Sequence, residues 1–121
     1  MKATELRIGN IVWQGEQYKE SIVTSYELNQ FSNYNRGVTH LAEYYKEWKP
    51  IPLTEEWLVK FGFKYIGSAP TLGINESWNR GNIRIEQLQS KELVFHGLQI
   101  KYVHSLQNLY FALTGKELLA K

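Results

Sequence analysis

The sequence predicts an α+β fold: a small antiparallel, β-rich N-terminal lobe, then a short helix, an antiparallel β-meander and a C-terminal helix packed on the sheet. Three observations predict it. Apolar and polar residues alternate near the N-terminus, a capped amphipathic segment follows Pro52, and short alternating runs precede a final segment with helical periodicity. We expect residues 1–49 to form the N-terminal lobe and residues 50–121 an α-β-β-β-α lobe, both sharing one core as a single domain.

The N-terminal lobe begins with strand patterns. Residues 6–13 place apolar side chains at alternate positions before the Gly9-Asn10 pair, which offers a turn ahead of Ile11, Val12 and Trp13. Residues 18–28 also alternate, with two interruptions, which is typical of a half-buried strand.

The chain that follows is less regular. Residues 29–37 are rich in turn formers and predict a surface loop. For residues 38–51 we expect a strand, a short helical turn and then extended chain, because the residue before a proline avoids the α region.

A short helix is the clearest local prediction. Thr54 is a good N-cap, Gly62 can adopt a left-handed C-cap, and the glutamates after Thr54 suit the positive end of the helix dipole. Leu53 and Leu58 have the spacing of a hydrophobic staple. Trp57 and Phe61 are four residues apart, so they lie on one face of the helix. A strand should start at Phe63.

The last third predicts a meander and a helix. Residues 67–82 lack a pattern, so we expect a long loop, and loops of that length are often functional. Residues 83–102 alternate around a tight turn at His96-Gly97. The C-terminal helix is predicted by apolar residues at i, i+3, i+4 and i+7, followed by a glycine cap: Leu106, Leu109, Tyr110, Leu113 and Gly115.

The composition of the chain limits which catalytic and metal-binding sites it can form. Apolar residues make up 43% of the 121-residue chain, enough for a packed core, and the net charge is only +2. There is no cysteine, and all 12 acidic residues are glutamate, so thiolate metal sites, cysteine nucleophiles and aspartate-oriented triads are excluded. The three histidines have no ligand spacing. We therefore expect no enzyme activity, no metal, no cofactor and no catalytic residue.

Three stretches resemble a known family: MKATELRIGNIV at 1–12, PIPLTEEWLVKFGF at 50–63 and IKYVHSLQNLYFALTGKEL at 100–118. They are similar to uncharacterised short proteins of gut anaerobes and of their phages and prophages. The resemblance implies a phage or mobile-element setting and a shared α+β fold, and it implies no activity. Because the matching residues are those expected to cap helices and fill the core, we assign them to structure.

The candidate binding residues therefore lie in the two irregular segments, 29–37 and 67–82, and at the start of the alternating stretch that follows. They combine aromatic rings with arginine, as interfaces do, and comprise Tyr34, Arg36, Trp78, Arg80 and Arg84. We expect a non-catalytic accessory protein that binds a host protein or small ligand, with host interaction or anti-defence as its setting. The structural alternative is that Trp78 only covers the sheet.

Nucleic-acid binding is the rival prediction, because aromatic residues near arginine can also stack on bases and contact phosphates. No helix-turn-helix, ribonucleoprotein signature or zinc finger supports it. No stretch approaches the roughly 18 apolar residues of a membrane helix, and the N-terminus lacks a secretion signal, so we expect a cytoplasmic protein. A homodimer stays open.

Overall fold

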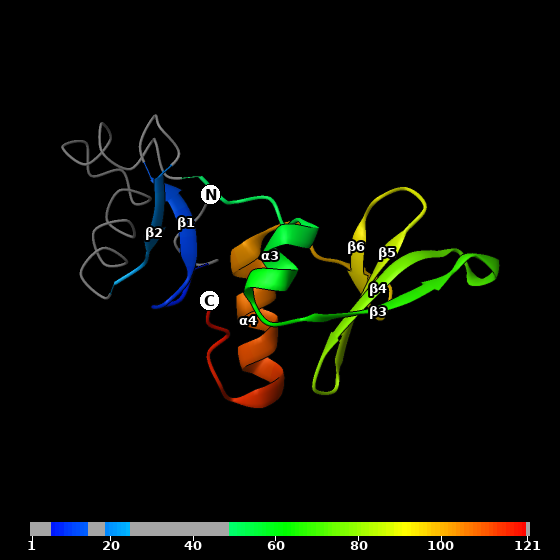
Figure 1. The fold of residues 1–121 in the computed structure, drawn as a ribbon. Helices are drawn as coiled ribbons and strands as arrows, with labels where there is room; N and C mark the ends of the chain where they lie inside the picture. Colours follow the sequence, from blue (N-terminus) through cyan, green and yellow to red (C-terminus); the bar gives the residue numbers. More distant parts are fainter. Residues whose placement is uncertain (1–5, 15–18, 25–48, 121) are drawn as a thin grey trace. The chain divides into compact units, whose positions relative to one another are not determined.

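A computed structural model describes residues 6–14, 19–24 and 49–120 and confirms the α+β fold (Figure 1). The described part contains a two-stranded sheet, a five-stranded sheet, both antiparallel, and two α-helices. The chain divides into two compact units: Met1–Ile51 with Tyr102–Leu109, and Pro52–Lys101 with Tyr110–Lys121. The C-terminal helix thus contributes residues to both units, and a single shared core stays a prediction.

The first unit contains a β-hairpin, β1 (Ile11–Gln14) with β2 (Lys19–Ile22), in which Ile11 pairs with Ile22. Gly9 has φ 96° and donates its N–H to the carbonyl of Val23 at 2.8 Å. The predicted Gly9-Asn10 turn is therefore confirmed, because a left-handed residue reverses the chain just before β1. The predicted strand over 18–28 is shorter, and residues 25–28 lie outside the described residues.

Helix α4 (Val103–Thr114) joins this unit through its first two turns. Gln107 is 1% exposed and makes two hydrogen bonds with the turn before β1. Its Oε1 accepts from the N–H of Ile11 at 2.8 Å, and its Nε2 donates to the carbonyl of Gly9 at 3.1 Å. Beside it, Asn10 Nδ2 donates to Asn108 Oδ1 at 2.9 Å. Polar side chains therefore satisfy the backbone of this turn.

The second unit begins with helix α3 (Glu55–Lys60), whose two ends test the caps predicted at Thr54 and Gly62. Thr54 is the N-cap by position, but its side chain makes no capping hydrogen bond. At the other end, Gly62 has φ 84° and donates to the carbonyl of Val59, while Phe63 donates to that of Leu58. These two bonds form a Schellman motif, so the glycine cap is confirmed.

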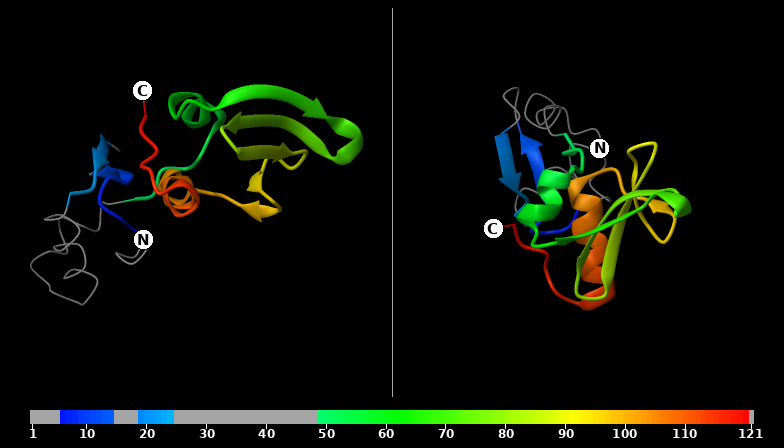
Figure 2. Two further views of the ribbon diagram at one scale, coloured as in Figure 1. Left: turned by 90° about the horizontal axis from the view of Figure 1, so that it is seen from below. Right: turned by 45° about the vertical axis from the view of Figure 1, so that its right-hand side comes forward.

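Five strands in sequential order form the sheet of this unit: β3 (Lys64–Ala69), β4 (Ile74–Arg80), β5 (Ile83–Leu88), β6 (Leu93–Phe95) and β7 (Leu98–Gln99). Figure 2 shows β3, β4 and β5 side by side, with the segment of β6 and β7 turning away from them. The predicted meander is thus confirmed and extended by two strands.

The prediction of a long loop over residues 67–82 is wrong. This stretch contains the end of β3, a single 3-10 turn at Pro70–Leu72, and β4. Two register shifts interrupt the pairing of β3 with β4, and Gly67, with φ 124°, lies between them. Bulges break the alternation of apolar and polar residues, so the sequence showed no period.

Two tight turns complete the meander. Lys91, between β5 and β6, has φ 76°, and the predicted His96-Gly97 turn has φ 48° and 80° at its two residues. Two positive φ values in a two-residue loop indicate a type I′ turn, whose twist suits a hairpin. That prediction is confirmed.

The last turns of α4 belong to the second unit. Gly115 has φ 72° and donates to the carbonyl of Phe111 at 2.8 Å, which confirms the predicted cap. Tyr110 is buried, whereas Leu113 is 53% exposed. Neither α3 nor α4, the α-helices of the described residues, has the length and apolar character needed to cross a bilayer.

Candidate functional site

Arg80 is the predicted site residue that the structure places at a pocket. It is the last residue of β4 and precedes the Gly81-Asn82 turn that leads into β5. Arg80 pairs with Ile83 across this turn, and Gly81 has φ 61°. A glycine with positive φ at the first turn position is typical of a type II′ hairpin, which fixes the backbone of Arg80.

Two contacts hold the guanidinium of Arg80. Its Nη1 donates to the carbonyl of Phe61 at 2.6 Å, and its Cζ lies 5.2 Å from the centroid of the Tyr110 ring. Phe61 is the C-cap of α3, so the cation also lies at the negative end of a helix. The hydrogen bond and the ring together restrict the orientation of the guanidinium plane.

This guanidinium lines a pocket of about 300 Å³, here called the Arg80 pocket. The turn after β4, strand β6 and the last turn of α4 contribute the other lining residues, which are Gly81, Asn82, Ile83, Phe95, Tyr110, Leu113 and Thr114. Its volume is at the lower end of the range for small-molecule sites. The lining thus combines one cation with rings and aliphatic side chains.

The charge of Arg80 has no counterion within the described residues. No carboxylate of that part of the chain lies within ion-pair distance of Arg80, and of the residues lining the pocket Arg80 alone is charged. A guanidinium carries five N–H donors, and one of them is used by Phe61. Donors and positive charge are therefore left for a ligand.

Of the other predicted site residues, Trp78 and Arg84 do not line this pocket. Tyr34 and Arg36 lie outside the described residues. Trp78 is not in a loop but in β4; it is 3% exposed and its ring packs edge-on against Tyr65 at 5.9 Å. A buried ring of this kind covers the sheet and offers no surface to a partner.

Arg84 lies on the opposite face of β5 from the Arg80 pocket. Ile83 and Ile85 on either side of it are buried, whereas the Arg84 side chain is 54% exposed. Its Nε lies 3.8 Å from Glu86 Oε2 and its Nη2 lies 3.4 Å from Ser77 Oγ. Alternation along the strand separates Arg84 from Arg80, so the two arginines do not form one patch.

Sequence reasoning missed the partners of Arg80. Helical periodicity predicts packing roles for Tyr110 and Leu113 and says nothing of a pocket, because only the tertiary fold places them, with Phe95, beside the turn after β4. One local feature of the sequence points to Arg80: it directly precedes the Gly81-Asn82 pair, which is typical of a hairpin turn. Residues beside such turns lie near the surface, where binding residues are common.

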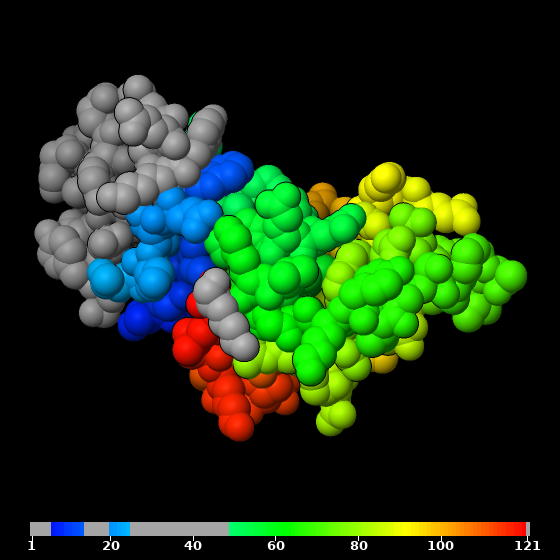
Figure 3. Space-filling view, viewed as in Figure 1, coloured from blue at the N-terminus to red at the C-terminus, as the bar shows by residue number. Residues whose placement is uncertain are grey.

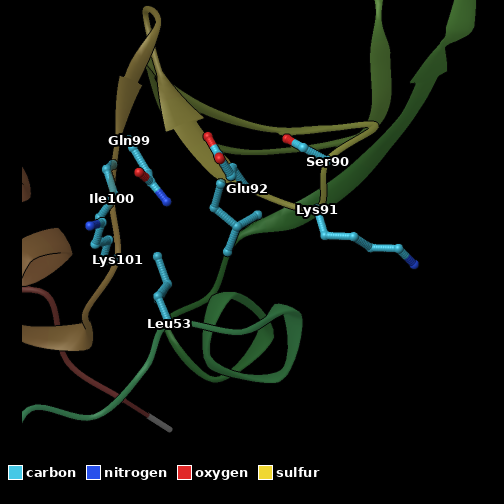
Figure 4. A pocket seen from close by; sticks show the side chains of 8 residues that line it. Leu53, Ser90, Lys91, Glu92, Gln99, Ile100 and Lys101 are labelled. Atoms are coloured by element: carbon cyan, nitrogen blue, oxygen red, sulfur yellow. The ribbon is translucent and has the colours of Figure 1, made fainter.

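A second hollow, of about 220 Å³, lies on the same unit beside the turn between β5 and β6 (Figure 4). Leu53 points into it, whereas the side chain of Lys91 points away from it. Glu92, Gln99 and Lys101 also line it, so both signs of charge are present. This hollow therefore does not present a single sign of charge, as the Arg80 pocket does.

Helix α3 and strand β3 form much of the face of this unit that Figure 3 shows in green. They carry exposed apolar side chains, at Val59, Tyr65 and Ile66. Tyr65 also interacts with Glu76: a hydrogen bond to the Glu76 side chain raises the pKa of the Tyr65 hydroxyl above its ordinary value. Scattered apolar residues are common on surfaces and do not by themselves mark a site.

Metal binding has no support in the described ranges 6–14, 19–24 and 49–120, where no group of three or more metal-ligating side chains occurs. Comparison with protein-family models, with curated proteins and with solved structures gives no match for this chain.

Proposed function

We propose that this chain is a non-catalytic binding protein and that the Arg80 pocket takes a small anionic ligand or an anionic group of a partner protein. The observation that supports it is the guanidinium of Arg80, fixed 5.2 Å from the Tyr110 ring centroid and facing a pocket of about 300 Å³. A fixed cation beside apolar surface is a common means of orienting a ligand.

The role as an accessory protein of a phage or mobile element is part of the same proposal. It is supported by the resemblance of the three sequence motifs, and host interaction or anti-defence would follow from that setting. Binding rather than catalysis is favoured because the pocket lining offers neither a general base nor a nucleophile beside an activating group.

Arg80 also has a structural contact, since its Nη1 bonds to the C-cap carbonyl of α3. A test must therefore separate folding from binding. Arg80→Lys keeps the positive charge near the helix end but loses the planar fork of donors. Arg84→Lys is the matched control, because Arg84 lies on the other face of the strand.

The experiment is a thermal-shift screen of small organic anions, inorganic phosphate, nucleotides and short oligonucleotides against the chain and both variants. A ligand that binds only the folded form raises the melting temperature. We expect an anion to stabilise the chain and the Arg84→Lys variant, and to stabilise Arg80→Lys much less. If no anion stabilises the chain, or if both variants respond alike, the proposal fails.

Nucleic-acid binding would give a different result in the same screen. Oligonucleotides would stabilise the chain, the effect would fall steeply with salt as counterions are released, and the Arg80→Lys and Arg84→Lys variants would respond alike, since both keep the positive charge. That outcome would replace the present proposal with the rival one.

A further inference from the structure

We infer that the Arg80 pocket selects a monocarboxylate with an apolar body over phosphate esters and nucleotides. This inference rests on the proposed function and names the ligand class of the same site. It depends on the number of charges in the pocket, on the donors that Arg80 has left, and on the apolar side chains that line the same pocket.

The charge count favours a monoanion. Arg80 is the one charged residue among those described that line the pocket, and the remaining polar side-chain groups are the amide of Asn82 and the hydroxyls of Tyr110 and Thr114, all of them uncharged. The hydroxyl of Thr114 is already engaged: it donates to the Tyr110 carbonyl at 2.8 Å and accepts from the N–H of Lys116 at 3.1 Å. A phosphate dianion or a polyphosphate would therefore leave charge uncompensated.

The geometry of Arg80 favours a carboxylate. Phe61 uses one N–H of Nη1, so the Nε and Nη2 donors are left to form the two parallel hydrogen bonds that a carboxylate accepts. The Tyr110 ring lies against the guanidinium and limits its rotation. A preoriented fork costs less conformational entropy on binding than a free arginine does.

Apolar side chains from the sheet and α4 complete the site. Ile83 is buried at the base of the turn, Phe95 is half-buried on β6, and Leu113 on α4 is 53% exposed. They offer a surface for a phenyl ring or a short alkyl chain attached to the carboxylate. Two sources share this chemistry: a free organic acid, and the C-terminal carboxylate of a peptide whose last residue is apolar.

Leu113 allows the charge of the pocket to be changed without disturbing the core, because it is largely exposed. Leu113→Glu adds a negative charge to the pocket lining, Leu113→Lys adds a positive one, and Leu113→Gln is the neutral control. Leu72→Glu is the matched control elsewhere, since Leu72 is 76% exposed and does not line the pocket.

The test measures dissociation constants by calorimetry for phenylpropionate, its uncharged amide, a leucine-terminated peptide with a free or amidated C-terminus, and adenosine monophosphate. We expect at least one free carboxylate to bind and its amide to bind at least roughly tenfold more weakly, as the loss of charged hydrogen bonds implies. Whether phenylpropionate or the free peptide binds more tightly identifies the source of the carboxylate.

The affinity of the Leu113 variants for the carboxylate should depend on the charge of the new side chain. Leu113→Gln removes apolar surface from the pocket, so it sets the baseline for the charged variants. Relative to Leu113→Gln, Leu113→Glu should weaken binding of the carboxylate by roughly two- to fivefold, as expected for exposed charge pairs, and Leu113→Lys should strengthen it by a similar factor. Leu72→Glu should leave binding unchanged, because Leu72 does not line the pocket. Equal responses to the Leu113→Glu and Leu72→Glu variants would overturn the assignment to this pocket.

The two proposals fail differently. If adenosine monophosphate binds in an Arg80-dependent way and the carboxylates do not, the ligand class is wrong and the binding function stands. If none of the probes or anions binds, both proposals fall.

Discussion

The buried side-chain oxygen of Gln107 accepts a hydrogen bond at 2.8 Å from the backbone N–H of Ile11, a residue 96 positions earlier in the chain. Gln107 Nε2 also donates to the carbonyl of Gly9, in the turn just before β1. The side chain of one residue on α4 thus hydrogen-bonds both an N–H and a carbonyl of the backbone at the start of β1.

Gln107→Ala should destabilise the protein by about 1–3 kcal/mol, because it leaves the buried N–H of Ile11 and the partly buried carbonyl of Gly9 without this partner. The free energy of unfolding from urea titration measures the effect. Gln89→Ala, at an exposed position between β5 and β6, is the control and should change it by less than about 0.5 kcal/mol. Equal stability of the two variants would contradict the role given to Gln107.

Lys91→Gly should stabilise the protein by up to about 1 kcal/mol. Lys91 has φ 76°, in a turn closed by bonds from Lys91 N to the Leu88 carbonyl and from Leu88 N to the Glu92 carbonyl. A left-handed conformation costs a non-glycine residue about 1–2 kcal/mol, and glycine avoids this cost. Part of the gain is offset because glycine loses more conformational entropy on folding.

The control for Lys91→Gly is Lys91→Ala, which removes the same charge but keeps the unfavourable φ. Urea titration of the three proteins should rank the glycine variant highest, with the alanine variant close to the parent chain. A glycine variant less stable than the alanine variant would show that this turn does not have the described conformation.

Tyr65 should ionise at higher pH than an ordinary tyrosine, because Glu76 accepts its hydrogen bond and the negative charge of Glu76 opposes tyrosinate. A pKa raised in the folded state means that this bond stabilises the fold below about pH 10 and ceases to do so as the pH rises through the folded pKa. Glu76→Gln should lower the pKa of Tyr65.

Tyrosinate absorbance followed against pH checks this prediction, with Tyr65→Phe in each background to isolate the signal of Tyr65. The midpoint should be higher with Glu76 than with glutamine at that position. An unchanged midpoint would mean that the two side chains do not interact in solution.

The parts of the fold that could be predicted from sequence are those set by local chemistry. Gly62, Gly97 and Gly115 have the positive φ expected of a helix cap, a hairpin turn and a second helix cap. Trp57 and Phe61, predicted to share a helix face, have ring centroids 5.6 Å apart. Each of these features is decided within a few residues of the chain.

Strand β4 and the Arg80 pocket could not be predicted in that way. The bulges at Gly67 and before Glu76 disturb the alternation that marks a strand, so Trp78 was placed in a loop although it is buried. The pocket needs Arg80 and Tyr110 together, and their contact depends on how the sheet and α4 pack. Sequence composition makes Arg80 a candidate but does not indicate its surroundings.

The most direct measurement is an NMR titration of the arginine Nε–Hε signals with phenylpropionate, with the signals of Arg80 and Arg84 assigned by the Arg→Lys variant of each. The account predicts a saturable shift of the Arg80 signal, because its remaining donors bind the carboxylate, and little change for Arg84. Shifts of both signals that grow together without saturating, or no shift at Arg80, would contradict it.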